Sequence, residues 1–264
     1  MKFLKINNLL LIIINIHIYN YCDGAPIQTA NYIDLTWGFD NNTLYWPNQV
    51  PFSFIKKTEG YKIYKNETYW YTAYNFCAGE HGGTHFDSPY HFNREGWKTG
   101  EVPISRLIGP GATVDVSNEV GNNRDFTLES EHLIKWEKEN GPIESGTILL
   151  LRFGWSSRYH SREDYFGLSP PDEKLHFPGI GQSAAEWIAN NKNIVGVGLD
   201  TPSIDTGHEI ISHRTLYAKN IYAIENVKIL ESLPARNFTL IVLPMKISEG
   251  TGGPCRIVAA LNGN

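Results

Sequence analysis

Short runs of β-branched, aliphatic and aromatic residues alternate with polar segments and predict more strands than helices. Seven such runs are candidate strands and lie at residues 33–36, 113–116, 146–153, 193–200, 222–225, 239–244 and 256–260. Residues 61–75 are rich in Tyr, Trp and Thr, which also favours strand. The runs do not alternate regularly with helices, so the pattern indicates an α/β domain with a mixed sheet rather than a βαβ array.

Two segments have the apolar spacing of a helix. Residues 129–136 begin with an acidic residue and then repeat apolar positions at helical spacing. Residues 183–189 do the same, and Ser183 is expected near the N-terminal cap. A turn is predicted immediately before this second helix, at residues 178–181.

The first residues have the layout of a secretory signal peptide. Lys2 and Lys5 precede an apolar run at residues 9–14, and small residues at 22–25 offer a cleavage point. We therefore expect residues 1–24 to be a signal peptide and the chain to be secreted, with an extracellular location.

A membrane anchor is the alternative interpretation of this segment. Asn15 and His17 interrupt the apolar run, which is shorter than the roughly 20 residues needed to cross a bilayer. We expect no membrane association after cleavage, and a single domain over residues 25–264.

Composition fits an ordinary globular domain. The 264 residues are 41% hydrophobic and 19% charged, which argues against disorder over most of the chain. The net charge is −5 and no run of lysine or arginine occurs, so a nucleic-acid partner is not expected.

Secretion would affect the cysteines and several asparagines. In an oxidising compartment Cys77 and Cys255 could form a disulfide, or they could stay separate buried thiols. Asn41, Asn66 and Asn237 each begin a glycosylation acceptor triplet, whose occupancy the sequence leaves open.

The residues from 81 to 91 have the strongest chemical signal. His81, His85, Asp87 and His91 all occupy odd positions, so an extended backbone can direct them to one side. The glycine pair after His81 and a nearby proline argue against a helix, and we expect a strand end that runs into a turn. Imidazole and carboxylate are the usual ligands of Zn²⁺ and related metals.

A second segment must complete such a metal site. Residues 200–208 are polar and follow a candidate buried strand, and His213 and Glu225 come after them. These two residues would give a mixed nitrogen and oxygen set suited to Zn²⁺ or Mn²⁺. From the residues alone, they cannot be chosen over the other histidines and acids, which are more often structural.

Other catalytic motifs are weak or missing. The sequence has no Gly-x-Ser-x-Gly motif, so a serine hydrolase is not expected. The glycine-rich residues 249–253 lack the ending of a phosphate-binding loop. Trp46, Phe92 and Trp97 are candidates for the aromatic walls of a substrate pocket, although such residues are more often part of the core.

The run His81-x-Gly83-Thr84-His85-x-Asp87-x-Pro89-x-His91 resembles the signature of the cyclase family of metal hydrolases. This family includes bacterial kynurenine formamidases and isatin hydrolases. The resemblance extends over about residues 30–262, and the further matching segments lie at residues 34–36, 46–47, 153–155, 178–179, 198–205, 213–226 and 253–256.

The resemblance implies a swivelling β/β/α domain, commonly assembled as a homodimer or homotetramer. It implies one or two metal ions, with Asp87 able to bridge two, and it places the glycine-rich residues 249–253 near the active site. The implied metal ligands are His81, His85, Asp87, His213 and Glu225, and the implied catalytic residue is His91.

The implied function is that of a secreted metal-dependent amidohydrolase acting on a small molecule. The expected substrate is an aryl formamide such as N-formylkynurenine, hydrolysed to formate and the amine, with His91 acting as general base and then acid. The alternatives are a hydrolase of another cyclic amide, lactam or ester, and a non-catalytic extracellular protein that binds a metal or ligand. Phe153 departs from the family pattern, where a small polar residue is expected, and this leaves the substrate open.

Overall fold

The computed structural model describes residues 31–168, 174–207, 209–230 and 233–262. Its main sheet has eight strands in the order β1-β12-β11-β5-β7-β9-β10-β4, and β12 also pairs with β4, so the sheet closes on itself. The eight strands are β1 (Asn31–Asp34), β4 (His85–Asp87), β5 (Ile108–Asp115), β7 (Thr147–Arg152), β9 (Ile194–Leu199), β10 (Tyr222–Glu225), β11 (Phe238–Pro244) and β12 (Gly252–Leu261). All seven candidate strands fall on this sheet.

The sheet is mixed, as the sequence predicted. Strands β5, β7, β9 and β10 are parallel neighbours, whereas β11, β12, β1 and β4 pair in antiparallel fashion. Buried strands such as β9 have both faces covered, which explains their continuous apolar sequences.

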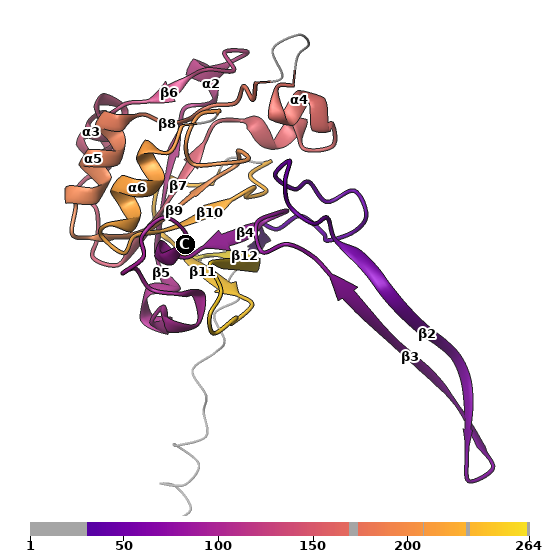
Figure 1. The fold of residues 1–264 in the computed structure, drawn as a ribbon. Coiled ribbons are helices and arrows are strands. Elements are labelled where there is room, and N and C mark those ends of the chain that lie inside the picture. The colour runs from indigo at the N-terminus through magenta and orange to yellow at the C-terminus, as the bar shows by residue number, and fades with distance from the viewer. Residues whose placement is uncertain (1–30, 169–173, 208, 231–232, 263–264) are drawn as a thin grey trace, which may run out of the picture.

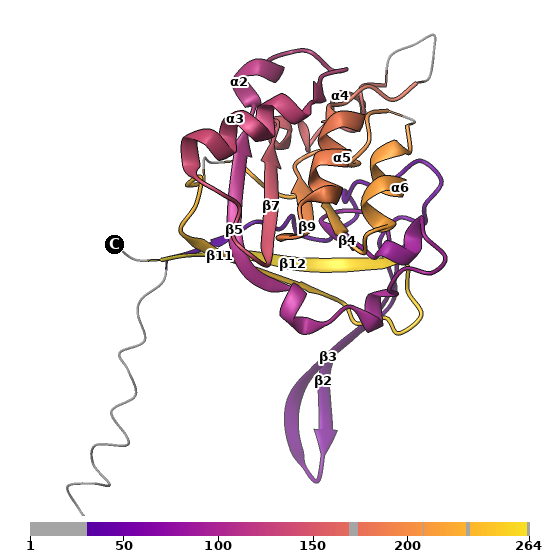
Figure 2. The same cartoon turned by 90° about the vertical axis from the view of Figure 1, so that its left-hand side faces the viewer.

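Helices cover one side of the sheet (Figures 1 and 2). The α-helices are α2 (Ser117–Val120), α3 (Ser130–Asn140), α4 (Arg162–Phe166), α5 (Gln182–Asn190) and α6 (Ile211–Tyr217). Short 3₁₀ helices lie at Pro89–His91, Thr99–Glu101, Ile104–Arg106 and Trp155–Arg158.

Successive residues of β7 belong to two different hydrophobic clusters. Leu149 and Leu151 belong to the outer cluster beneath the helices, whereas Ile148 and Leu150 belong to the inner cluster enclosed by the sheet. This alternation follows from the two-residue period of a strand. It fixes which face of each strand can hold polar chemistry.

Of two predictions around residue 180, one was wrong and one was confirmed. Gly179 and Ile180 form a short strand, β8 (Gly179–Ile180), paired with β6 (Thr127–Leu128), and not a turn. Gly181 is the N-cap of α5, so Ser183 lies near the cap, as expected. The Ser183 hydroxyl accepts a hydrogen bond from the backbone N–H of Ser130, in the first turn of the neighbouring α3, at 2.9 Å.

The segment predicted as strand at residues 61–75 is part of a long β-hairpin. Strands β2 (Ser53–Tyr64) and β3 (Glu67–Cys77) form a separate two-stranded sheet that projects from the body (Figure 1). Lys65 and Asn66 have φ values of 46° and 68°, which gives the two-residue turn typical of hairpins. We call this hairpin, residues 53–77, the arm.

The two cysteines left open by the sequence are both free, with Cys77 exposed and Cys255 buried. The predicted signal peptide, residues 1–24, lies outside the described residues. Within the residues that the structure describes, no helix has the length and apolarity to cross a membrane.

Candidate active site

Strand pairing brings the two candidate windows together. In β4, Phe86 belongs to the inner cluster, so His85 and Asp87 face the opposite side of the strand. Strand β10 pairs with β4 so that Glu225 lies opposite His85, and opposed residues share a face. His213 comes from α6, on the same side.

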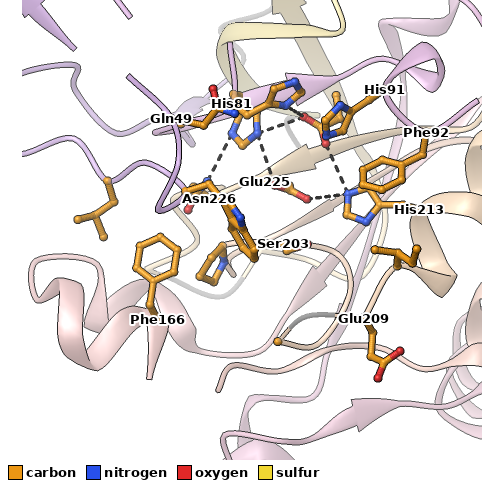
Figure 3. Close-up of a pocket in the computed structure, with 18 residues that line it drawn as sticks. Gln49, His81, His91, Phe92, Phe166, Ser203, Glu209, His213, Glu225 and Asn226 are labelled. Carbon is orange, nitrogen blue, oxygen red and sulfur yellow. Dashed lines mark hydrogen bonds and ion pairs between the residues drawn. The ribbon is translucent and has the colours of Figure 1, made fainter. Parts of the chain in front are cut away.

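The five implied metal ligands form two groups that share Asp87. Figure 3 labels His81, His213 and Glu225 among them. Asp87 Oδ1 lies 2.7 Å from His81 Nδ1 and 3.1 Å from His85 Nε2. On the other side, His213 Nε2 lies 3.6 Å from Asp87 Oδ2 and 3.3 Å from Glu225 Oε1. Within each group, one ligand atom from every residue lies within 4.8 Å of the others.

The cluster is buried, and its carboxylates need a positively charged partner. Burial disfavours the charged form of His85, but Asp87 and Glu225 outweigh it and raise the pKa of His85 to about 9. Burial also disfavours the charged form of His213, but Asp205, Asp87 and Glu225 raise its pKa well above the usual range. Burial acts to raise the pKa of Asp87, but the neighbouring histidines hold it well below the usual range. Without another cation, protons on the histidines must neutralise these carboxylates.

One nitrogen of the cluster, His85 Nε2, has the surroundings that a metal ligand needs. His85 Nδ1 lies 3.0 Å from the carbonyl oxygen of Gly83, to which it can donate. His85 Nε2 is buried without a hydrogen-bond partner and faces Asp87 and Glu225. A free imidazole lone pair beside carboxylate oxygens fits a divalent cation, because metal-ligating histidines usually donate their other N–H to a fixed acceptor.

Asp205 holds His213 from behind. Its carboxylate lies 2.5 Å from His213 Nδ1 and accepts the backbone N–H groups of Ser212 and His213, at 2.6 and 3.1 Å. The adjacent Ile204 N–H donates to Glu225 Oε1 at 3.1 Å. Asp205 and Ile204, from a segment that the sequence singled out as polar, therefore orient two of the five implied ligands.

His81 is oriented through a second chain of contacts. Its Nε2 lies 2.8 Å from Thr251 Oγ1, which donates to Glu80 Oε2 at 2.6 Å. The glycine-rich residues 249–253 thus lie beside the site, where the family resemblance placed them.

A buried carboxylate anchors the neighbouring loop. Asp200 accepts backbone N–H groups of Phe153, Trp155 and Ser156, at 2.8, 2.7 and 3.2 Å. The Phe153 side chain packs in the outer cluster and is not among the described residues that line the pocket. Its departure from the family pattern therefore does not alter the described pocket wall directly.

A pocket of about 300 Å³ opens above the cluster (Figure 3). The implied ligands His81, His85, Asp87, His213 and Glu225 line it. Its remaining described lining includes the apolar Leu44, Trp46, Phe92, Phe166, Pro202 and Ile210, and the polar Gln49, Ser203, Glu209 and Asn226.

His91 also lines this pocket. Its ring stacks on that of His81, with centroids 3.9 Å apart, and burial lowers the pKa of His91 to about 4. The neutral ring at pH 7 can accept a proton.

The aromatic-wall prediction was right for Trp46 and Phe92 and wrong for Trp97. Trp97 packs against the inner cluster, with the Arg106 guanidinium 5.0 Å from its ring centroid. Phe166 completes the wall from α4. Its sequence neighbourhood gave no signal for this role, because only the folded chain brings α4 to the pocket.

A histidine and carboxylate cluster beneath an apolar pocket, on a closed mixed sheet, defines a hydrolase of the metal-dependent class. The chain belongs to the Cyclase family, whose model matches residues 33–206. It is 32% identical to an isatin hydrolase of Roseibium aggregatum over 231 residues, which cover 80% of this chain and 85% of that protein.

Two further comparisons agree with this class. A kynurenine formamidase of Bacillus cereus is 30% identical over 234 residues, or 88% of this chain and 98% of that protein. The solved structure of isatin hydrolase A from Ralstonia solanacearum superposes with a TM-score of 0.78 and 26% identity, covering 99% of both chains. These comparisons confirm the predicted family, the predicted fold class and the prediction that the chain is an enzyme.

Proposed function

We propose that this enzyme uses a divalent cation to hydrolyse the amide C–N bond of a small aromatic substrate. The observation that carries the proposal is Asp87, whose two oxygens face two separate groups of ligand atoms on the pocket floor. One or two ions would be held by His81, His85, Asp87, His213 and Glu225. This set of nitrogen and oxygen donors suits Zn²⁺ or Mn²⁺.

When bound by these residues, such a cation would lower the pKa of a water molecule to about 7 and polarise a carbonyl group. The protein then has to place the amide carbonyl and move protons. His91 is neutral and faces the pocket, so it can accept a proton from the attacking water and return it to the departing nitrogen. Trp46, Phe92 and Phe166 provide apolar surface for an aromatic ring.

The pocket favours a neutral substrate. No lysine or arginine occurs among its described lining residues, and residues 169–173, 208 and 231–232 contain none in sequence. A substrate carboxylate that lies away from the metal would therefore have no lysine or arginine side chain in the described lining to pair with. We favour a neutral cyclic amide of the kind that isatin hydrolase opens, in agreement with the structural similarity.

An aryl formamide such as N-formylkynurenine is the second candidate. Its support comes from the kynurenine formamidases that are 30% identical to this chain. Its amino-acid tail carries the carboxylate for which the described lining offers no lysine or arginine.

A substrate panel tests the choice. The purified enzyme, supplied with Zn²⁺ or Mn²⁺, is assayed on isatin, on N-formylkynurenine and on an N-formylated aminoacetophenone that lacks the amino-acid tail. We expect kcat/KM to be highest for isatin and higher for the tail-free formamide than for N-formylkynurenine. A preference for N-formylkynurenine over both would reject the neutral-substrate assignment, and no turnover on any amide would reject the proposed reaction class.

We also propose, from the sequence of residues 1–24, that the enzyme is secreted. Expression of the full chain in a eukaryotic secretory host and N-terminal sequencing of protein from the medium test this. Mature protein that begins near Ala25 would support secretion, and protein retained in cells with Met1 in place would reject it.

A further inference from the structure

Asn226 brings a side-chain amide to the pocket, beside the ligand cluster. It follows Glu225 directly in the chain, lines the pocket and is only 4% exposed. Figure 3 shows Asn226 between His81 and Phe166 in that view. A buried amide carries a donor and an acceptor that both need partners, and the reaction proposed above gives this one no part.

The backbone of Asn226 is fixed on both sides. Its N–H donates to the carbonyl oxygen of Thr201 at 3.0 Å, and its own carbonyl oxygen accepts the Thr84 hydroxyl at 2.8 Å. Its φ of 55° lies in the left-handed region, which asparagine adopts more readily than most residues. Such conformations persist where the surroundings hold them, and they cluster at active sites. The amide is therefore held in place before any substrate binds.

One end of the amide faces His85. Asn226 Nδ2 lies 3.4 Å from His85 Nδ1. That imidazole nitrogen also lies 3.0 Å from the carbonyl oxygen of Gly83, which can only accept, so Nδ1 carries the hydrogen. Two donors do not pair with each other. Because the two ends of an amide have nearly the same shape, the contact is satisfied when the group is turned so that Oδ1 accepts from His85 and Nδ2 points away.

The other end of the amide is open to the pocket. No described residue makes a hydrogen bond to it. Two other neutral polar side chains of the described lining are less suitably placed, since Gln49 is exposed and the Ser203 hydroxyl already accepts the backbone N–H of Asp205 at 3.3 Å. An unpaired donor in a largely buried site needs an acceptor, and a bound substrate can supply it.

We propose that Asn226 Nδ2 donates a hydrogen bond to the carbonyl oxygen of the substrate amide. This role rests on the proposed amide hydrolysis. As the water oxygen bonds to the carbonyl carbon, the π electron pair moves onto the carbonyl oxygen and His91 takes a proton from the water. The hydrogen bond from Asn226 strengthens as this oxygen becomes negative. The electron pair then returns to carbon, the C–N bond breaks, and His91 gives the proton to the departing nitrogen.

Two substitutions separate this role from simple support of His85. Asn226→Asp keeps the size of the side chain and the oxygen that faces His85, but it replaces the donor with a second oxygen. Asn226→Gly keeps the left-handed backbone and removes both ends of the amide. Asn220→Asp is the matched control. Asn220 has a φ of 54°, lies outside the described pocket lining and accepts the Trp97 N–H through Oδ1 at 3.1 Å.

Turnover and metal affinity are measured side by side, with the best substrate of the panel. At saturating Zn²⁺ or Mn²⁺, kcat/KM should fall about 10²-fold in both Asn226 variants and stay within twofold in Asn220→Asp. Titration against a competing chelator should show no loss of metal affinity in Asn226→Asp, since the oxygen that supports His85 is retained. A purely structural Asn226 would instead give normal turnover in Asn226→Asp, with metal and turnover lost together in Asn226→Gly.

Binding of a lactam gives a readout that needs no turnover. The probe is oxindole, a neutral aromatic lactam, and its affinity for the metal-supplied proteins is measured by calorimetry. The dissociation constant should rise about tenfold in both Asn226 variants, because each loses the donor, and should be unchanged in Asn220→Asp.

Three results would overturn the proposal. They are wild-type kcat/KM in Asn226→Asp, an oxindole affinity that either Asn226 variant leaves unchanged, and a wild type that does not bind oxindole. A wild type that binds oxindole but turns over no amide would reject the proposed hydrolysis, and the oxindole affinities of the variants would still decide whether Asn226 contacts a lactam carbonyl.

Discussion

The metal-ligand cluster and the arm are neighbours in the chain with opposite construction. The arm ends at Cys77, and the cluster begins at His81. The cluster buries charged side chains, with Asp87 only 1% exposed. The arm, by contrast, leaves Tyr61 and Trp70 largely in solvent. Each region therefore reverses the usual rule that apolar residues lie inside and charged residues outside.

The two regions differ in whether their side chains find contact partners within the chain. The buried cluster has partners for most of its polar atoms within the chain, and the exception, His85 Nε2, is the atom that faces the carboxylates. The aromatic side chains of the arm pack on one another and, at its base, on Phe52, but most of their surface stays exposed. We infer that a cation completes the first region, whereas the arm is open to solvent in the single chain.

Replacement of His91 should give the largest change that leaves the cluster intact. His91→Ala removes the proposed proton acceptor but none of the implied ligands, so kcat should fall by about 10²–10⁴ with metal content unchanged. The measurement is kcat beside metal content by mass spectrometry. His160→Ala, at an exposed histidine outside the pocket lining, is the control. Full activity in His91→Ala would remove its assigned role.

The metal-free protein should lose stability as the pH rises. The folded pKa of His85 is about 9 against an unfolded value of 6.5, so its contribution is complete below pH 6.5 and disappears as the pH passes 9. The expected fall in the free energy of unfolding is up to about 3 kcal/mol. Urea unfolding at pH 6 and pH 9 with a chelator present measures it.

The matched variant for this titration is His85→Gln. It should flatten the decline in stability between pH 6 and pH 9. An equally steep decline in the variant would show that other groups cause it.

Loss of the support behind His213 should weaken metal binding moderately. Asp205→Asn keeps the shape of the side chain but removes the charge that fixes the His213 ring, so metal affinity should fall about 10–100-fold. Titration with Zn²⁺ against a competing chelator gives the affinity. Asp34→Asn, on the exposed surface, should bind metal like the wild type, and equal affinity in Asp205→Asn would refute the positioning role.

The smallest effect is expected at an exposed ion pair. Arg256 contacts Asp34 at 2.7 Å with both side chains largely in solvent, so Arg256→Ala should change the free energy of unfolding by about 1 kcal/mol or less. A loss of several kcal/mol, measured by urea unfolding, would show that exposed polar contacts matter here as much as the buried cluster.

The sequence predicted the sheet and the first window of the site because both rest on local patterns. Runs of β-branched and aliphatic residues identified the strands, and odd-numbered spacing placed His85 and Asp87 on one face. Closure of the sheet by β12 and β4 was not predictable, since pairing between distant strands leaves no local pattern. The role of Asp205 was missed for the same reason, because it depends on how α6 docks.

The arm illustrates a different limit. Its aromatic and β-branched residues give the strand signal of a buried sheet, yet they are exposed in the single chain. Strand propensity reports the backbone conformation that such side chains favour. It does not report which surface they contact.

The most direct test of the account is metal content and turnover of the wild type before chelation, after chelation and after resupply of Zn²⁺ or Mn²⁺, beside Asp87→Asn. The account predicts that chelation abolishes turnover, that resupply restores it, and that Asp87→Asn neither retains metal nor regains activity, because both groups of ligands share this carboxylate. Turnover that survives complete removal of metal, or an active Asp87→Asn protein, would contradict it.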